Sequence, residues 1–206
     1  MTQLSRKLII ADIIFFLVAI FVVLEIVFNG FLVAVDVSVN ALVPAIYNTQ
    51  FIEFSKIINT IFDAIPMIVI SFILCIVIWY KDCKKDALFF TSVIMINAIL
   101  IFLIKNIVQR PRPLNALISL KDYGFPSGHV TNALVFFGIL SYLLLKNPHI
   151  KKLKFFIIGI FIFMIALIGF TRIYLNVHWL SDVIGGLAIG GFILISCILL
   201  EQRKAN

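Results

Sequence analysis

Long apolar stretches separated by short charged segments are the feature of this sequence that most restricts its fold. The stretch from Ala64 to Tyr80, for example, contains no charged residue, and an apolar stretch of this length can cross a bilayer as a helix. Hydrophobic residues make up 63% of the chain and charged residues 13%, whereas soluble domains use roughly 45–50% apolar residues. The chain is therefore predicted to be an integral membrane protein.

The apolar stretches predict an all-α fold, a polytopic membrane protein with six transmembrane helices. The spans are expected at residues 8–28, 64–80, 87–104, 127–145, 155–170 and 181–200. The first is too long for the core of a signal peptide, roughly 7–15 residues, and no cleavage-site pattern follows it, so we interpret it as an uncleaved helix. Residues 1–206 are interpreted as a single domain because the polar segments between the spans are short.

The segment between the first and second spans, residues 29–63, mixes polar and apolar side chains. Part of it has apolar residues at helical spacing: Phe51, Phe54, Ile58, Ile61 and Phe62. Such spacing predicts an amphipathic helix at the membrane interface. We expect this segment to be a lid or packing element over the bundle.

Lysine and arginine residues are unevenly divided between the two sides of the predicted bundle. The N-terminus, the loops at 81–86 and 146–154 and the C-terminal tail carry eleven of the 17, and the other side carries six. Because cytoplasmic loops are enriched in these residues, both termini are predicted to be cytoplasmic. The net charge of +7 therefore reflects membrane topology, and no nucleic-acid partner is expected.

Three polar segments lie at span ends on the opposite, extracytoplasmic face of this topology. They are Lys105 to Pro113, with the pattern K-x6-R-P; Pro126-Ser127-Gly128-His129; and Thr171-Arg172, followed by His178 and Asp182. Helix periodicity alone does not require the three segments to share a face. Their agreement therefore predicts that they form one site.

The residue types in these segments suit chemistry on a phosphate. Lys105, Arg112 and Arg172 could surround an anion, while Ser127 and Gly128 stand where the N-terminus of a helix offers free amide groups. Two histidines could then divide the work. His178 lies four residues before Asp182, which could orient it as a nucleophile, and His129 could protonate the leaving oxygen.

Each segment alone has a simpler explanation: an Arg–Asp pair capping a helix, an ordinary helix start, or a rigid Arg-Pro loop. Their shared position favours the catalytic interpretation. His149 falls in a basic loop and is assigned no role. The spacing of Cys75, Cys83 and Cys197 matches neither a metal site nor a disulfide framework. No cluster typical of a magnesium or zinc site is present either, so we expect a metal-free mechanism without cofactors.

The combined pattern K-x6-R-P, P-S-G-H and (S/T)-R-x5-H-x3-D resembles the type 2 phosphatidic acid phosphatase (PAP2) superfamily, with Thr171 where that family usually has serine. The resemblance implies a six-helix membrane lipid phosphatase, similar to bacterial phosphatidylglycerophosphatase B or undecaprenyl pyrophosphate phosphatase. It also implies that His178 forms a phosphohistidine, that Asp182 orients it and that His129 acts on the leaving group. Phosphate would be bound by Lys105, Arg112, Ser127, Gly128 and Arg172.

The sequence therefore predicts a multi-pass cell-membrane phosphatase for a lipid phosphate or diphosphate that enters from the bilayer. Undecaprenyl pyrophosphate, phosphatidylglycerophosphate and phosphatidic acid all fit this description. A lipid phosphotransferase remains an alternative, because it shares the first half-reaction. A non-catalytic carrier of anionic lipids is a further alternative, although binding alone needs no nucleophile. The oligomeric state is left open.

The predicted topology can be tested by labelling cysteines in intact cells. A cysteine introduced at Asn115 should react with a membrane-impermeant thiol reagent, whereas one introduced at Asn147 should not, because only the first position is predicted to be extracytoplasmic. Labelling is read as the increase over the parent chain, which has three cysteines of its own. The reverse pattern would place the polar segments at the cytoplasmic face.

Overall fold

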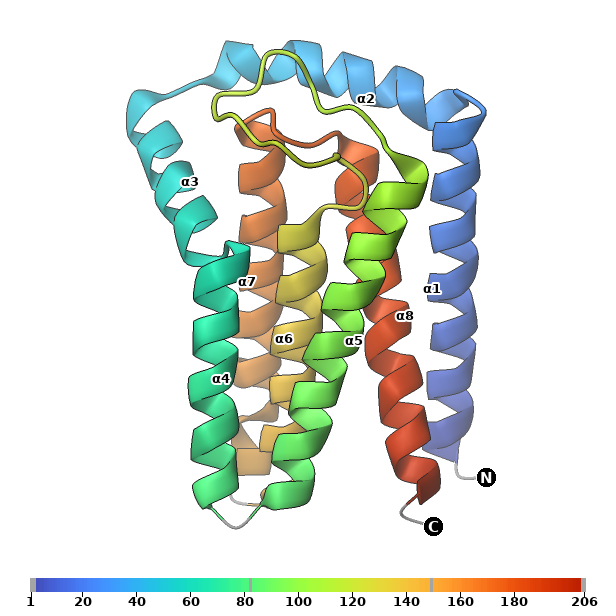
Figure 1. Cartoon of the computed structure of the whole chain (residues 1–206), viewed down its shortest axis with the longest axis vertical. Coiled ribbons are helices and arrows are strands. Elements are labelled where there is room, and N and C mark those ends of the chain that lie inside the picture. Colours follow the sequence, from blue (N-terminus) through green and yellow to red (C-terminus); the bar gives the residue numbers. More distant parts are fainter. Residues whose placement is uncertain (1–2, 82, 149, 205–206) are drawn as a thin grey trace.

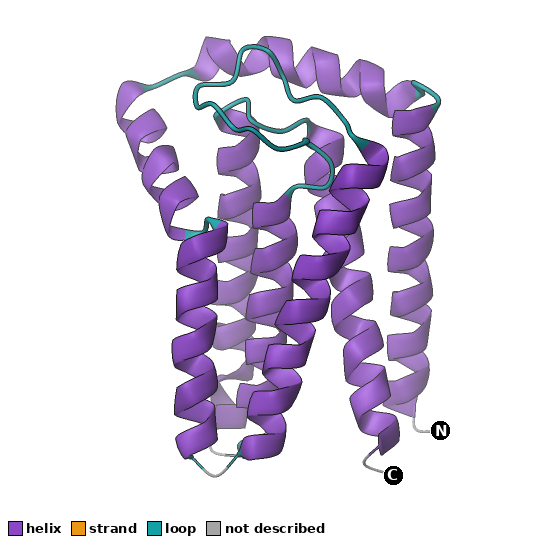
Figure 2. Cartoon of the chain, in the orientation of Figure 1, coloured by secondary structure: helices purple, strands orange, loops and turns teal. Residues whose placement is uncertain are grey.

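The computed structural model describes residues 3–81, 83–148 and 150–204, so the predicted lack of a role for His149 concerns a position outside the described residues. Every regular element in these ranges is a helix (Figure 2). In chain order they are α1 (Gln3–Val27), α2 (Phe31–Leu42), the 3-10 turn η1 (Val43–Ile46), α3 (Thr49–Ile61), α4 (Ala64–Tyr80), α5 (Lys84–Val108), α6 (Gly128–Leu144), η2 (Ile150–Leu153), α7 (Lys154–Tyr174) and α8 (Leu180–Lys204) (Figure 1).

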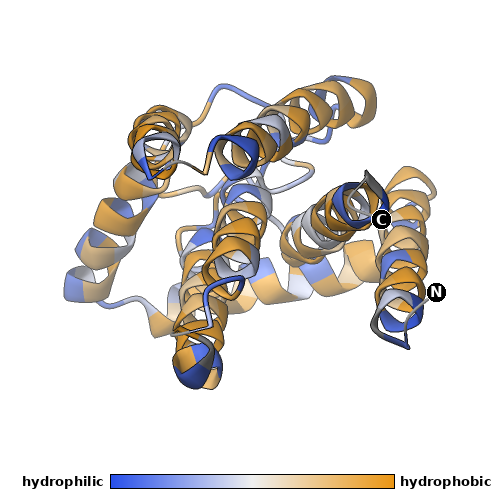
Figure 3. Cartoon of the chain, turned by 90° about the horizontal axis from the view of Figure 1, so that it is seen from below, coloured by the Kyte–Doolittle hydropathy of each residue, from blue (hydrophilic) through white to orange (hydrophobic). Residues whose placement is uncertain are grey.

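Large apolar side chains on the outside of the bundle show that it is built for a bilayer. Leu17 of α1 is 57% exposed, Phe72 of α4 65% and Phe155 of α7 84%. The helices are hydrophobic along most of their length (Figure 3). Because soluble proteins rarely expose continuous apolar surface on this scale, these faces are assigned to contact with lipid. The all-α, multi-pass membrane fold is thus confirmed.

The helices do not by themselves establish the number of membrane spans. Four of them, α1, α5, α7 and α8, are long and apolar enough to cross a bilayer, and α3 with α4 passes the same test as one pair bent by 52°. The helix α6 is apolar but has 17 residues, close to the lower limit for a span. The count of six spans therefore stays a prediction.

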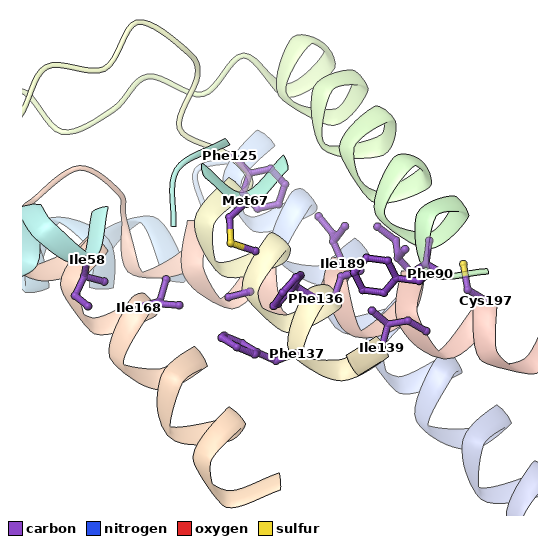
Figure 4. Packing of buried hydrophobic residues seen from close by; sticks show 14 of the residues in the cluster. Ile58, Met67, Phe90, Phe125, Phe136, Phe137, Ile139, Ile168, Ile189 and Cys197 are labelled. Atoms are coloured by element: carbon purple, nitrogen blue, oxygen red, sulfur yellow. The ribbon is translucent and has the colours of Figure 1, made fainter. Parts of the chain in front are cut away.

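The centre of the bundle is formed by α6 and α8, which pack closely against each other. Their approach depends on glycine in α8: a Cβ atom at Gly186 would lie 3.0 Å from the backbone oxygen of Ser127, at the start of α6. Buried rings and branched side chains, including Phe90, Phe136 and Ile189, fill the space around this pair (Figure 4). A small residue between two membrane helices lets their backbones come together, so α6 and α8 pack closely at Gly186.

The structure confirms a helical segment at residues 29–63 and shows which of its helices covers the end of the bundle. The helix that lies across the end of the bundle is α2, whereas α3, which contains the amphipathic spacing, descends beside α7 (Figure 1). The apolar face of α3 is used for packing, since Phe51 contacts the rings of Phe170 and Tyr174. A stripe at helical spacing shows that one face is buried but not what buries it.

A turn with two stabilising features sends the chain from α1 into α2. Asn29 adopts φ 49°, a left-handed conformation that asparagine tolerates better than most residues. The Glu25 carboxylate then accepts a hydrogen bond of 2.9 Å from the backbone amide of Leu32 in the first turn of α2. A free amide at a helix start needs such an acceptor, so Glu25 helps to fix where α2 begins.

Both chain ends approach the same end of the bundle, and the long connection between α5 and α6, residues 109–127, lies at the opposite end beneath α2 (Figure 1). This connection is fastened to its surroundings by backbone hydrogen bonds, from Leu117 to Leu175 and from Ser127 to Asp182. The predicted polar segments are thus gathered at the end that faces away from the termini.

Candidate active site

A cavity of about 520 Å³ opens at the end of the bundle that carries the long connection. Residues from all three polar segments line its wall, namely Lys105, Arg112, Gly128, His129 and His178. Below them the cavity continues between apolar residues of α4 and α5, among them Met67, Ile101 and Phe102. The cavity therefore joins a basic mouth to a mainly apolar interior.

His178 lies between a carboxylate and a guanidinium group. Its Nδ1 is 3.3 Å from Oδ2 of Asp182, and its Nε2 is 2.9 Å from Nη1 of Arg112. Because a guanidinium group can only donate, Nε2 must accept, which leaves the proton on Nδ1. Asp182 therefore keeps the proton on Nδ1, and the unprotonated Nε2 lies on the opposite side of the ring, next to Arg112.

Burial keeps this imidazole neutral. The side chain is almost fully buried, and burial lowers the pKa of His178 to about 4, although the hydrogen bond to Asp182 acts in the opposite direction. Desolvation disfavours the charged form of a histidine. At neutral pH the ring therefore keeps the unprotonated Nε2 that a nucleophile needs.

Asp182 is fixed by its place in the first turn of α8. Its Oδ2 accepts a hydrogen bond of 3.0 Å from the backbone amide of Trp179, the residue before the helix begins. A side chain at the third helical position often caps a helix in this way. Oδ1 is 2.6 Å from Nη1 of Arg110. The carboxylate that orients His178 is thus held by the helix backbone and by a second arginine.

Lys105 and Arg112 share one carboxylate, that of Asp122 in the long connection. The Nζ of Lys105 is 2.8 Å from Oδ2 of Asp122, and Nη2 of Arg112 is 2.7 Å from Oδ1. Burial alone would raise the pKa of Asp122, but the hydrogen bonds and charges of Lys105 and Arg112 lower it to about 2. Asp122 is therefore ionised at neutral pH and pairs with both cations.

His129 is positioned by the end of α3. Its Nε2 lies 3.1 Å from the backbone oxygen of Asn59, which can only accept, and 4.0 Å from Oδ1 of Asp63. Nε2 therefore carries a proton and donates it to Asn59. The bend between α3 and α4 thus sets the orientation of the second histidine at the cavity wall.

Of the remaining predicted phosphate-binding residues, Gly128 lines the cavity, whereas Ser127 and Arg172 are not among the described residues that line it. Within the described residues, the Ser127 hydroxyl is buried without a hydrogen-bond partner. A Cβ atom at Gly128 would lie 3.9 Å from the Lys105 side chain, so glycine leaves this part of the wall open. Arg172 is fully buried, and its guanidinium donates to Asn59 and Thr171. Phosphate binding by Arg172 stays a prediction.

Four residues at the site were assigned no part in it by sequence reasoning: Asp36, Asn59, Arg110 and Asp122. For two of them the sequence contains a feature that could have indicated a role. Asp36 is a lone charge in the apolar stretch Phe31–Leu42, and Arg110 stands two residues before Arg112 in the R-P-R-P sequence. Nothing in the spacing indicates their partners, because Arg110 is bonded to residues 74 and 72 positions away along the chain. Among the described residues, no three His, Cys, Asp or Glu side chains are grouped as metal ligands would be.

Comparison with known proteins identifies the family. The sequence model of the PAP2 superfamily matches residues 86–205, which include all eight predicted site residues. The chain belongs to the PAP2 superfamily. The resemblance seen in the three motifs is thus confirmed.

Individual PAP2 relatives support the same assignment. Phosphatidylglycerophosphatase B of Bacillus subtilis is 34% identical over 110 residues, 51% of this chain and 53% of the relative. The dolichyldiphosphatase of Saccharomyces cerevisiae is 30% identical over 150 residues, 67% of this chain and 60% of the relative. The matches thus span about half to three fifths of these curated relatives.

Solved structures show that the whole fold is shared. A crystal structure of a transmembrane PAP2 type phosphatidylglycerolphosphate phosphatase from Bacillus subtilis superimposes with a TM-score of 0.86 at 22% identity, covering 93% of this chain and 96% of that one. LpxE of Aquifex aeolicus gives a TM-score of 0.62 at 24% identity, covering 80% and 94%. At this level of identity the likeness establishes the arrangement of the helices.

The position of Asp122 predicts that it competes with phosphate for Lys105 and Arg112. Replacing it by asparagine should tighten binding of inorganic phosphate on the order of tenfold, since about 1.4 kcal/mol of competing attraction corresponds to that factor. The measurement is the rise in melting temperature of the purified protein as phosphate is added in detergent.

Asp86→Asn is the matched control, because Asp86 pairs with Lys146 at 2.8 Å in the part of the bundle near the chain ends. This variant should respond to phosphate as the parent does. An equal or weaker response of Asp122→Asn would mean that Asp122 positions the two cations instead of competing for them.

Proposed function

We propose that this protein hydrolyses the phosphate or diphosphate group of a membrane lipid through a phosphohistidine at His178. The observation that carries the proposal is the line from Asp182 through His178 to Arg112 at the mouth of a cavity with an apolar interior. It supplies a nucleophile, a group that orients it and a cation for the phosphate. Its family relatives include named lipid phosphatases, in agreement with this function.

The first half-reaction breaks the bond between phosphorus and the lipid oxygen. Lys105 and Arg112 hold the phosphate oxygens, and Nε2 of His178 attacks phosphorus as the lipid oxygen leaves in line. The ring becomes positively charged as the nitrogen–phosphorus bond forms, and Asp182 stabilises that charge through Nδ1–H. His129, once it carries a proton on both ring nitrogens, gives one of them to the departing oxygen and becomes neutral, so the lipid leaves as an alcohol or, from a diphosphate, as a monophosphate.

The second half-reaction transfers the phosphoryl group from His178 to water. His129, now without the proton it donated, takes one from the attacking water molecule. The nitrogen–phosphorus bond breaks, inorganic phosphate is released, and both histidines return to their starting states. If a lipid alcohol took the place of water, the same site would act as a phosphotransferase, so product analysis with and without an added lipid acceptor separates these two functions.

The two histidines should respond differently to the leaving group. His178→Ala should abolish turnover and phosphoenzyme formation, because no nucleophile remains. His129→Ala should slow lipid phosphates by roughly 10²–10⁴-fold, the usual contribution of a general acid, but should slow aryl phosphates with an acidic phenol far less. The measurement compares the turnover of both substrate types by the two variants in detergent.

Equal loss on both substrates in the two variants would contradict this division of roles. A His178→Ala protein that still hydrolyses lipid phosphate would overturn the proposed function itself. If the parent protein binds these lipids but turns none over, the carrier alternative holds.

Polar side chains in the wall of the cavity favour a glycerol-based lipid as the substrate. Ser71 of α4, Asn97 of α5 and Asn132 of α6 line the cavity below the histidines. The Asn97 amide donates to Asn132 at 2.7 Å, and within the described part of the chain its own oxygen is buried without a partner. A glycerol hydroxyl can donate a hydrogen bond to such an oxygen, whereas an isoprenoid chain cannot.

This preference predicts how an apolar substitution in the wall alters the substrate ratio. Asn97→Leu should lower kcat/KM for phosphatidylglycerophosphate about tenfold, the effect of losing one hydrogen bond of ~1.5 kcal/mol, with little change for undecaprenyl diphosphate. Ile94→Leu, in the same wall, is the control and should leave the ratio unchanged. Equal effects of Asn97→Leu on both lipids would show that Asn97 only joins α5 to α6.

We further propose that the site acts at the extracytoplasmic face. The support comes from the distribution of lysine and arginine, which favours cytoplasmic termini, together with the position of the cavity at the far end of the bundle (Figure 1). An enzyme of this orientation would act on lipids of the outer leaflet.

A further inference from the structure

Asp36 of α2 and Arg110 of the long connection form a buried chain of charges that ends at Asp182. The Nη2 of Arg110 is 2.6 Å from Oδ2 of Asp36, and its Nη1 is 2.6 Å from Oδ1 of Asp182. The side chains of Asp36 and Arg110 are 1% and 7% exposed. A single guanidinium thus joins the helix across the end of the bundle to the carboxylate that holds His178.

Ser181 reinforces this chain at the start of α8. Its backbone amide donates to Oδ1 of Asp36 at 2.8 Å, and its hydroxyl lies between Asp36 and Arg110. The first turn of a helix favours negative charge because its amide groups point outward. The carboxylate of Asp36 is therefore held by two separate parts of the structure, α8 and Arg110.

The net charge of Asp36, Arg110 and Asp182 determines how well the cationic form of His178 is stabilised. Arg110 alone would cancel the charge of Asp182, and a neutral Arg–Asp pair is a poor stabiliser of the cation that forms as His178 bonds to phosphorus. Asp36 offsets the charge of Arg110. The three groups together then keep one negative charge, and the Asp182 carboxylate carries it next to the imidazole ring.

We propose that Asp36 and Arg110 are positioning residues for the reaction, which act through Asp182 on the nucleophile His178. Arg110 fixes the carboxylate of Asp182, and Asp36 preserves its charge. Neither Asp36 nor Arg110 is among the described residues that line the substrate cavity. Both instead line a separate hollow beside α1 and α2, together with Pro111 and Trp179. Their effect should therefore fall on the chemical step and not on substrate binding.

The inference rests on the proposed function, and its test is a double-mutant cycle on purified protein with a lipid phosphate. Asp36→Asn leaves the chain neutral and should lower kcat about tenfold or more, with KM within about twofold of the parent. The double variant Asp36→Asn/Arg110→Gln again leaves a single negative charge on Asp182. It should recover a large part of the lost kcat, although the contacts of residue 36 in α2 with residue 110 and with Ser181 are then weakened.

Glu25→Gln is the matched control for a purely structural role. Glu25 is also a carboxylate that holds α2, through the Leu32 amide, but it has no described contact with the site. It should retain the parent kcat, and melting temperatures of all variants are measured alongside.

Each outcome decides between the two roles. Recovery in the double variant without recovery of melting temperature supports the proposal. Asp36→Asn with the parent kcat overturns it, and so does a double variant as slow as Asp36→Asn, or a Glu25→Gln protein that loses kcat equally. A parent protein without turnover, or a His178→Ala protein that retains it, would instead refute the proposed function.

Discussion

The architecture of the site depends on neutralising the positive charges gathered at one end of an apolar bundle. A buried charge without a partner costs several kcal/mol, and the side chains of Lys105, Arg110 and Arg112 are only 11%, 7% and 11% exposed. Asp122 forms ion pairs with Lys105 and Arg112. Arg110 forms ion pairs with Asp36 and Asp182. These pairings hold the long connection between α5 and α6 in place, and with it the walls of the cavity.

Much of the fold and the centre of the site follow from the sequence for simple physical reasons. Apolar runs of span length predict helices with only small errors at their ends, and topology alone predicts that three motifs share one face. The site partners from distant segments were not predictable in this way. Asn59 and Asp36 reach His129 and Arg110 across large separations in sequence, and a contact of this kind depends on how helices pack. The apolar stripe of α3 likewise did not indicate that α7 would cover part of it.

The helices before the matched family region contribute directly to the site. The PAP2 model begins at residue 86, yet α2 supplies the carboxylate on Arg110 and α3 supplies the carbonyl that holds His129. The three motifs therefore contain the groups proposed to bind phosphate, while the orientation of these groups also relies on the N-terminal third of the chain. Differences between family members in that part of the sequence can alter the site without changing any motif residue.

The carboxylate of Asp122 makes binding at this site an exchange of anions. A lipid phosphate that takes Lys105 and Arg112 has to displace a group that already carries one negative charge. The diester phosphates of ordinary membrane lipids also carry one negative charge, so their attraction to Lys105 and Arg112 would exceed that of the Asp122 carboxylate by little. A phosphate monoester carries up to two, and a diphosphate carries more than a diester. On the proposed function, the resting protein should therefore discriminate against the diester head groups that surround it and favour the excess charge of a terminal phosphate.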